Sequence, residues 1–236
     1  NLSSGNTDEV WKMFKIMINT NDVSLLPSKV LSNNVITHLV NDGNDVCNLK
    51  RAFVSMVFLV EKDSNFIEFD TIRNVLESMC VANVFAPPVA LIKCMFKNRV
   101  YVPFSVWGDV VVEISKKSGN FEGFLGVFHE CWWVVIDEKL EYMKPNLLAC
   151  NAALEGCCFE VESIKEAEKV TELMSVFTVK PNEVSFSLLG YLYAFKGLKG
   201  KLIELEDIMS GLGITDKTGF LSNLIRGYVK SGSLEC

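Results

Sequence analysis

Histidine is nearly absent from this chain, and the usual motifs of catalytic and metal sites are missing. Only His38 and His129 occur among 236 residues, no C-x-x-C pair is present, and no glycine-rich phosphate loop is found. A zinc site needs several His, Cys or carboxylate ligands. We therefore interpret His129-Glu130-Cys131 as helix positions rather than a metal or deaminase site. The sequence predicts no enzymatic activity, no cofactor, no metal and no small-molecule substrate.

Long apolar runs are also missing. The longest, Phe53–Val60, is far shorter than the roughly 18 residues that a membrane span needs, so no membrane partner is expected. The cysteines mostly lie within apolar, helix-like runs, which predicts buried thiols rather than a disulfide framework. The eight cysteines stand at positions 47, 80, 94, 131, 150, 157, 158 and 236.

The chain also lacks an excess of positive charge. The chain has 29 acidic and 23 basic residues and a net charge of −6. Affinity for nucleic acid depends on Lys and Arg at the phosphates, so this balance disfavours a general polyphosphate binder but still allows a local basic stripe. With 49% hydrophobic residues, the chain is expected to fold.

A repeat is the main feature that is present. Lys144-Pro145-Asn146 and Lys180-Pro181-Asn182 lie 36 residues apart, and each precedes an apolar helix-like run. A second amphipathic run, Ile164–Met174, lies between them. A fixed period of this size is typical of stacked repeat proteins. The sequence therefore predicts an all-α solenoid of antiparallel helix pairs.

Two segments allow other interpretations. Phe53–Val60 is rich in β-forming residues and could be a strand, although its place in the repeat favours a helix. Ser222–Gly232 is predicted to be a first helix without a partner. Because a helix pair cannot bury its apolar face alone, we expect the natural chain to continue or another element to cover this end.

The run Leu224-Ile225-Arg226-Gly227-Tyr228-Val229-Lys230-Ser231-Gly232, and Lys144-Pro145-Asn146 ahead of Cys150-Asn151, resemble the pentatricopeptide repeat family. The related tetratricopeptide repeat has 34 residues; the spacing of 35 or 36 and the Lys-Pro-Asn junctions favour the pentatricopeptide type. The resemblance implies a right-handed superhelix and one array over residues 1–236. Its repeats would span 1–28 (partial), 29–69, 70–104, 105–146, 147–182, 183–217 and 218–236 (partial).

The resemblance also implies how RNA would be read, with one base per repeat contacted by two side chains. An amide can donate to or accept from a base edge, and an apolar residue one turn earlier can flank the base. Only Asn151 with Asn182 is a common combination in the family, and it favours a pyrimidine. The implied pairs are Asn33 with Phe69, Asn74 with Phe104, Asp109 with Asn146, Asn151 with Asn182, and Ser187 with Lys217. The implied flanking residues are Val30, Val106, Leu148 and Val184, with Thr71 departing from the pattern.

Two functions remain open from the sequence. The resemblance implies a non-catalytic adaptor that binds single-stranded RNA in organellar RNA processing, splicing, stability or translation. Such proteins mostly work in plant mitochondria or chloroplasts, and a transit peptide is expected to be absent from this chain, which starts at Asn1. The alternative is a scaffold for protein partners in an organellar complex. The acidic balance, the poor base-reading pattern and the aromatic cluster Phe124, Phe128, Trp132 and Trp133 favour that alternative.

Overall fold

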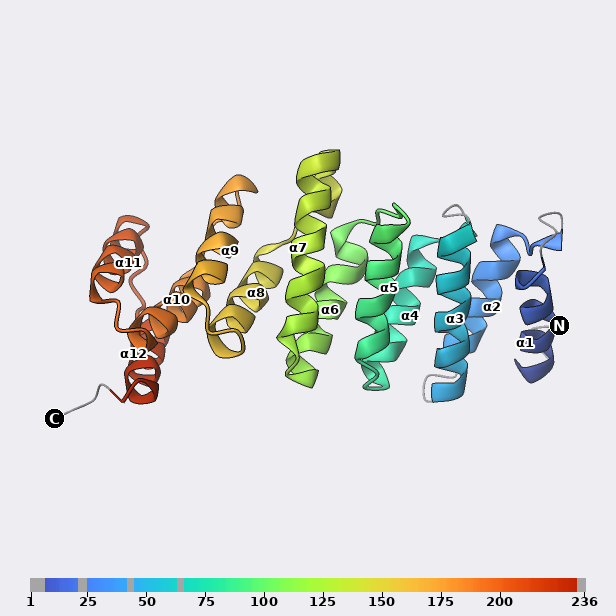
Figure 1. The fold of residues 1–236 in the computed structure, drawn as a ribbon, viewed down its shortest axis with the longest axis horizontal. Helices are drawn as coiled ribbons and strands as arrows, with labels where there is room; N and C mark the ends of the chain where they lie inside the picture. Colours follow the sequence, from blue (N-terminus) through green and yellow to red (C-terminus); the bar gives the residue numbers. More distant parts are fainter. Residues whose placement is uncertain (1–6, 21–24, 42–44, 63–65, 233–236) are drawn as a thin grey trace. The chain divides into compact units, whose positions relative to one another are not determined.

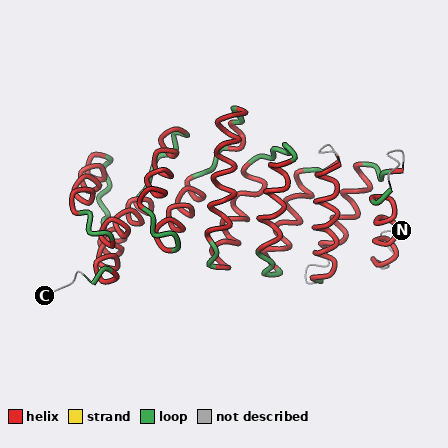
Figure 2. Tube along the Cα trace, in the orientation of Figure 1, coloured by secondary structure: helices red, strands yellow, loops and turns green. Residues whose placement is uncertain are grey.

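Helices are the only regular elements in the described part of the chain, as Figure 2 shows. The computed structural model describes residues 7–20, 25–41, 45–62 and 66–232. Phe53–Val60 lies inside a helix, so the strand alternative is wrong. The α-helices are α1 (Thr7–Ile18), α2 (Lys29–Asn41), α3 (Val46–Lys62), α4 (Phe69–Val81), α5 (Ala86–Lys97), α6 (Phe104–Ser118), α7 (Phe121–Glu138), α8 (Leu147–Phe159), α9 (Ile164–Val176), α10 (Glu183–Phe195), α11 (Lys199–Gly211) and α12 (Thr218–Lys230), with a short 3-10 helix, η4 (Glu141–Met143), after α7.

The helices belong to two compact units, Asn1–Lys144 and Pro145–Cys236. In the first unit the first helices of successive pairs, α2, α4 and α6, pack against one another, and the second helices, α3, α5 and α7, do the same. Figure 1 shows these as two layers. In the second unit α8, α10 and α12 pack in series, and α9 and α11 pair with α8 and α10. The predicted all-α repeat solenoid is confirmed.

Burial follows the same register in every complete repeat. Counted from the first residue of each first helix, residues seven, eight, eleven and twelve are buried in α2, α4, α8 and α10, and α6 departs only at residue seven. This spacing forms one stripe along a helix. Burying a large apolar side chain contributes about 1.5–3 kcal/mol, so the stripe holds the repeats within each unit together. In α2, α4 and α8 these residues are Val35, Ile36, Leu39 and Val40; Val75, Leu76, Met79 and Cys80; and Ala153, Leu154, Cys157 and Cys158.

Cysteine contributes to this core as a small apolar residue. No disulfide joins the cysteines that the structure describes, and burial raises the pKa of Cys150 to about 12. A thiol with such a pKa stays protonated and packs as a hydrophobic side chain. The prediction of buried thiols is confirmed for Cys80, Cys131, Cys150, Cys157 and Cys158, whereas Cys94 is half-buried, Cys47 is exposed and Cys236 lies outside the described residues.

Two glycines let α10 and α12 approach closely. A Cβ on Gly227 would lie 2.4 Å from the backbone oxygen of Tyr191, and one on Gly190 would lie 2.6 Å from the ring of Phe220. Phe220 is fully buried in this contact. Glycine is therefore required on both sides of the crossing, because any side chain would push the helices apart.

We expect Gly227→Ala to destabilise the second unit by about 1–3 kcal/mol, since the new methyl group would meet backbone atoms that cannot move aside. Urea unfolding followed by circular dichroism would measure the change. Gly200→Ala is the matched control: Gly200 lies in α11 with open space around it, so its replacement should stabilise the helix by roughly 0.5–1 kcal/mol. Equal effects of the two variants would contradict the close crossing.

Candidate nucleic-acid interface

Helix starts decide which residues occupy equivalent places in the repeats. Asn33, Asn151 and Ser187 are each the fifth residue of their helices, α2, α8 and α10. Asn74 and Asp109 are instead the sixth residues of α4 and α6, because these helices begin one residue ahead of the predicted repeats 70–104 and 105–146. We infer that the equivalents of Asn151 in α4 and α6 are their fifth residues, Arg73 and Gly108.

Burial of the second helix residues supports this shift. A side chain that flanks a base must be exposed, yet Thr71 and Val106 are buried. The residues that stand second in the helices α4 and α6 are Asp70 and Ser105, which are exposed but polar. Exposed apolar second residues occur on α2, α8 and α10, where Val30, Leu148 and Val184 are 65%, 45% and 51% exposed.

The repeat that starts with α6 lacks a side chain at its fifth residue. The Phe104 ring packs 4.9 Å from the ring of Trp107 and covers Gly108. A Cβ on Gly108 would lie 2.1 Å from that ring. Phe104 is buried and therefore cannot contact a base, as its predicted pairing with Asn74 would require. Phe69, the other predicted phenylalanine, is half exposed as the first residue of α4.

Asn33 uses its side chain inside the protein. Its Nδ2 donates to the backbone oxygens of Lys29 and Phe66 at 2.7 and 2.9 Å, and its Oδ1 accepts from the backbone N–H of Glu68 at 2.9 Å. Only 5% of the residue is exposed. Both amide hydrogens are thus consumed, and Asn33 ties α2 to the segment that leads into α4.

Asn151 and Asn182, one of the predicted base-reading pairs, are hydrogen-bonded to each other. The Nδ2 of Asn151 donates to the Oδ1 of Asn182 at 3.1 Å. Asn182 caps α10, accepting from the backbone N–H of Ser185 at 3.2 Å, and the Ser185 hydroxyl accepts from the backbone N–H of Asn182 at 3.1 Å. The Ser185 hydroxyl also donates to the Oδ1 of Asn151 at 2.6 Å. Both asparagines are half-exposed at the end of this network.

The other predicted residues have different surroundings. Ser187 is buried, and a Cβ on Gly219 of α12 would lie 3.3 Å from its hydroxyl oxygen, so α12 covers it. Asn146 caps α8, accepting from the backbone N–H of Ala149 at 2.9 Å. Asn74 lines a hollow of about 390 Å³ that Val40, Asn41, Glu77, Ser78 and Val81 also line. Asp109 is exposed in the first unit, whereas its predicted companion Asn146 lies in the second.

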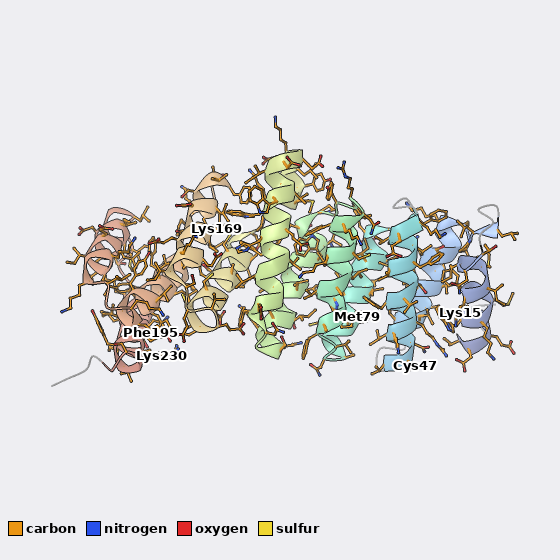
Figure 3. All side chains as sticks on the ribbon, viewed as in Figure 1. Lys15, Cys47, Met79, Lys169, Phe195 and Lys230 are labelled. Carbon is orange, nitrogen blue, oxygen red and sulfur yellow. The ribbon has the colours of Figure 1, made fainter. Side chains whose placement is uncertain are left out.

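A group of cations and aromatic rings in the second unit was missed by the sequence analysis. The Arg226 guanidinium lies 5.3 Å from the ring of Phe159, and the Lys230 Nζ lies 4.8 Å from the ring of Phe195, which Figure 3 labels beside it. Lys230 also pairs with Glu162, and this hydrogen bond lowers the pKa of the Glu162 carboxyl. The signal that could have found the group is the spacing of Arg226 and Lys230 four residues apart on one helix.

The comparisons with known proteins agree with this architecture. Residues 1–144 match a family model described as At1g68980, TPR repeats. The chain is 48% identical over 240 residues to the Arabidopsis thaliana pentatricopeptide repeat-containing protein At1g68980, mitochondrial, covering 99% of this chain and 38% of that protein. The chain belongs to the pentatricopeptide repeat family. It is likewise 48% identical over 238 residues to the pentatricopeptide repeat-containing protein At1g69290 of Arabidopsis thaliana.

This pentatricopeptide repeat chain spans little more than a third of the length of these relatives, 38% and 36%. Proteins of this repeat family are generally non-catalytic. Among the described residues no cluster of three His, Cys, Asp or Glu could hold a metal ion. None of the helices in the described ranges has the length and apolarity needed to cross a bilayer.

We expect Asn33→Ala to lower the free energy of unfolding by about 1–3 kcal/mol, because the backbone N–H of Glu68 and the backbone oxygen of Phe66 would lose their partner. The midpoint of urea unfolding would report the loss. Asn34→Ala, at the exposed neighbouring position of the same helix, should change stability little. An unaltered midpoint for Asn33→Ala would show that the residue does not tie α2 to the next repeat.

Proposed function

We propose that this pentatricopeptide repeat chain binds single-stranded RNA as a non-catalytic adaptor in organellar RNA metabolism. The observation that carries the proposal is the half-exposed Asn151–Asn182 pair, with exposed Leu148 and Val184 at the starts of the two helices that hold it. The name of the relative At1g68980 includes mitochondrial, which favours a mitochondrial site of action over a chloroplast. The role would be in RNA processing, splicing, stability or translation.

The geometry suits one unpaired base. Leu148 and Val184 are the second residues of α8 and α10, and the amides of Asn151 and Asn182 lie on the same pair of helices. A base between two apolar side chains buries its faces, while the amides reach its hydrogen-bonding edge. Stacking and burial do not distinguish one base from another, so a preference for a pyrimidine would come from hydrogen bonds to the two amides.

The remaining repeats offer less to RNA. α2 has the exposed Val30, but Asn33 has no amide hydrogen left. α4 and α6 have polar second residues, and Gly108 has no side chain. Asn74, Asp109, Asn146 and Ser187 therefore contribute at most secondary contacts in this proposal. Its footprint is centred on the second unit, where Arg226 lies over the rings of Phe159 and Tyr191 and Lys230 is paired with Glu162.

A second candidate function is a scaffold for a protein partner, and the observation that favours it is Trp133. The aromatic cluster of α7 divides: Phe124, Phe128 and Trp132 are buried in the core, whereas Trp133 is 68% exposed. Ile136, three residues on, is also exposed. Exposed tryptophan is enriched in the centres of protein interfaces, and apolar surface of this kind marks partner sites.

For RNA binding, we expect Asn151→Ala to weaken affinity for a pool of single-stranded RNAs by roughly two- to twelvefold, the loss of about 0.5–1.5 kcal/mol from one hydrogen bond. Fluorescence anisotropy at fixed salt would measure this. Asn74→Ala, at the sixth residue of α4, is the control and should bind as the wild type does. Equal affinities of the two variants, or no binding at all by the wild type, would rule out the proposed site.

The salt dependence of the same titration is a second test of the proposal. Lys230 is paired with Glu162, so Arg226 is the cation of this group left for a phosphate, and the slope of log affinity against log salt should be about −0.7, the value for one phosphate neutralised on a single strand. A slope several times steeper would place the main contacts elsewhere on the chain.

For the scaffold, a photo-crosslinking amino acid at position 133 should yield one defined protein adduct in a mitochondrial extract. The same probe at Val54, an exposed apolar position on α3 in the same layer, should not yield it. Identical adduct patterns from both positions would argue against a partner surface on α7.

A further inference from the structure

We infer that Ser185 is a positioning residue that sets which hydrogen-bonding groups Asn151 and Asn182 present to a base, leaving N–H donors outward. The inference rests on the proposed function. It starts from the capping box of α10, in which Asn182 and Ser185 exchange hydrogen bonds with each other's backbone N–H groups. Backbone N–H groups can only donate, so any side-chain atom bonded to one of them must be an acceptor.

The orientation of the Asn182 amide follows first. The atom that accepts from the backbone N–H of Ser185 at 3.2 Å must be the oxygen of Asn182. The Asn151 atom 3.1 Å from that oxygen must then be a donor, which identifies it as Nδ2. The oxygen of Asn151 consequently lies toward Ser185.

The Ser185 hydroxyl completes the chain of bonds. Its oxygen accepts from the backbone N–H of Asn182 at 3.1 Å, so its single hydrogen is free to donate to the oxygen of Asn151 at 2.6 Å. Asn182 Oδ1 also lies 3.1 Å from this hydroxyl, but one hydrogen serves one strong bond, and the shorter contact takes it. The assignment of oxygen and nitrogen in both amides therefore follows from main-chain donors and does not depend on a chosen side-chain orientation.

Three N–H hydrogens are left over, beside one lone pair on the Asn151 oxygen, which accepts a single bond. Both amide oxygens already accept within the network, whereas Asn151 keeps a second hydrogen on Nδ2. The Nδ2 of Asn182 has no hydrogen-bond partner in the described part of the chain, so both of its hydrogens are available. A pair in this state matches a base edge with neighbouring acceptors. Cytosine has such an edge in its O2 and N3, whereas uracil places an N–H between its two carbonyl oxygens.

In the first repeat the backbone N–H bonds its asparagine directly, although Thr71, the third residue of α4, holds the place that Ser185 holds in α10. There Asn33 accepts directly from the backbone N–H of Glu68, the residue that precedes α4, and the asparagine is buried with both hydrogens used. In the second unit the Ser185 hydroxyl stands between the corresponding backbone N–H, that of Asn182, and Asn151. Asn151 is half-exposed beside this hydroxyl. Removing it would free Asn151 to bond that N–H directly, as Asn33 does.

The test compares Ser185→Ala with Ser185→Thr, which keeps the hydroxyl. Competition anisotropy would measure the ratio of affinities for two short RNAs that differ only in carrying one cytosine or one uracil. We expect the wild type and Ser185→Thr to prefer cytosine. Ser185→Ala should lose this preference by roughly two- to twelvefold, the equivalent of one hydrogen bond. A merely structural role would weaken both RNAs equally and leave the ratio unchanged, and that result would overturn the inference.

A second measurement follows the network without RNA. In NMR spectra the side-chain amide of Asn151 should exchange with solvent faster than that of Asn33 in the wild type, and should become protected like Asn33 in Ser185→Ala. Unchanged exchange in that variant would also overturn the role of Ser185. Failure of the wild type to bind any RNA, with the exchange behaving as expected, would instead reject the proposed function and leave Ser185 as a structural relay only.

Discussion

The mainly apolar stripe at residues seven, eight, eleven and twelve of the first helices α2, α4, α6, α8 and α10 is the constraint on which the structure depends. Each stripe must be covered by the neighbouring helices, because neither helix of a pair can bury it alone. Meeting that requirement repeatedly places equivalent residues of successive helices at equivalent positions. The second and fifth residues of each helix lie outside the stripe. They are therefore aligned along each unit because the stripes pack, and not through contacts between these residues themselves.

The architecture was predictable because the stripe is visible in the sequence. The Lys-Pro-Asn junctions before α8 and α10 mark helix starts clearly, and both junction asparagines cap their helices. No such junction precedes α4 or α6, where Glu68 and Pro103 provide no side-chain cap. We infer from the starts of α4 and α6 and from the burial of Thr71 and Val106 that counting from the family pattern there gives a register one residue late.

The fate of individual asparagines was not predictable in this way. Asn33 and Asn151 hold the same place in their helices, yet one is consumed by main-chain groups and the other is half-exposed. The difference arises from the segment that leads into the next helix, which offers the carbonyl of Phe66 in one case and a capping box in the other. A pattern of residue types contains no information on the path of that segment. The repeat family therefore identifies where a base could bind, while the local hydrogen bonds decide whether a side chain is left for it.

The glycine crossing of α10 and α12 limits how these repeats can be rearranged. α12 meets α10 through Gly227, its tenth residue, whereas the tenth residue of α10 itself is Leu192. A copy of α10 placed in the position of α12 would bring a leucine side chain against the backbone at Tyr191. The first helices of this chain are therefore not interchangeable. An engineered array that reorders them must keep a glycine at the position of Gly227 in any helix that packs against α10 as α12 does.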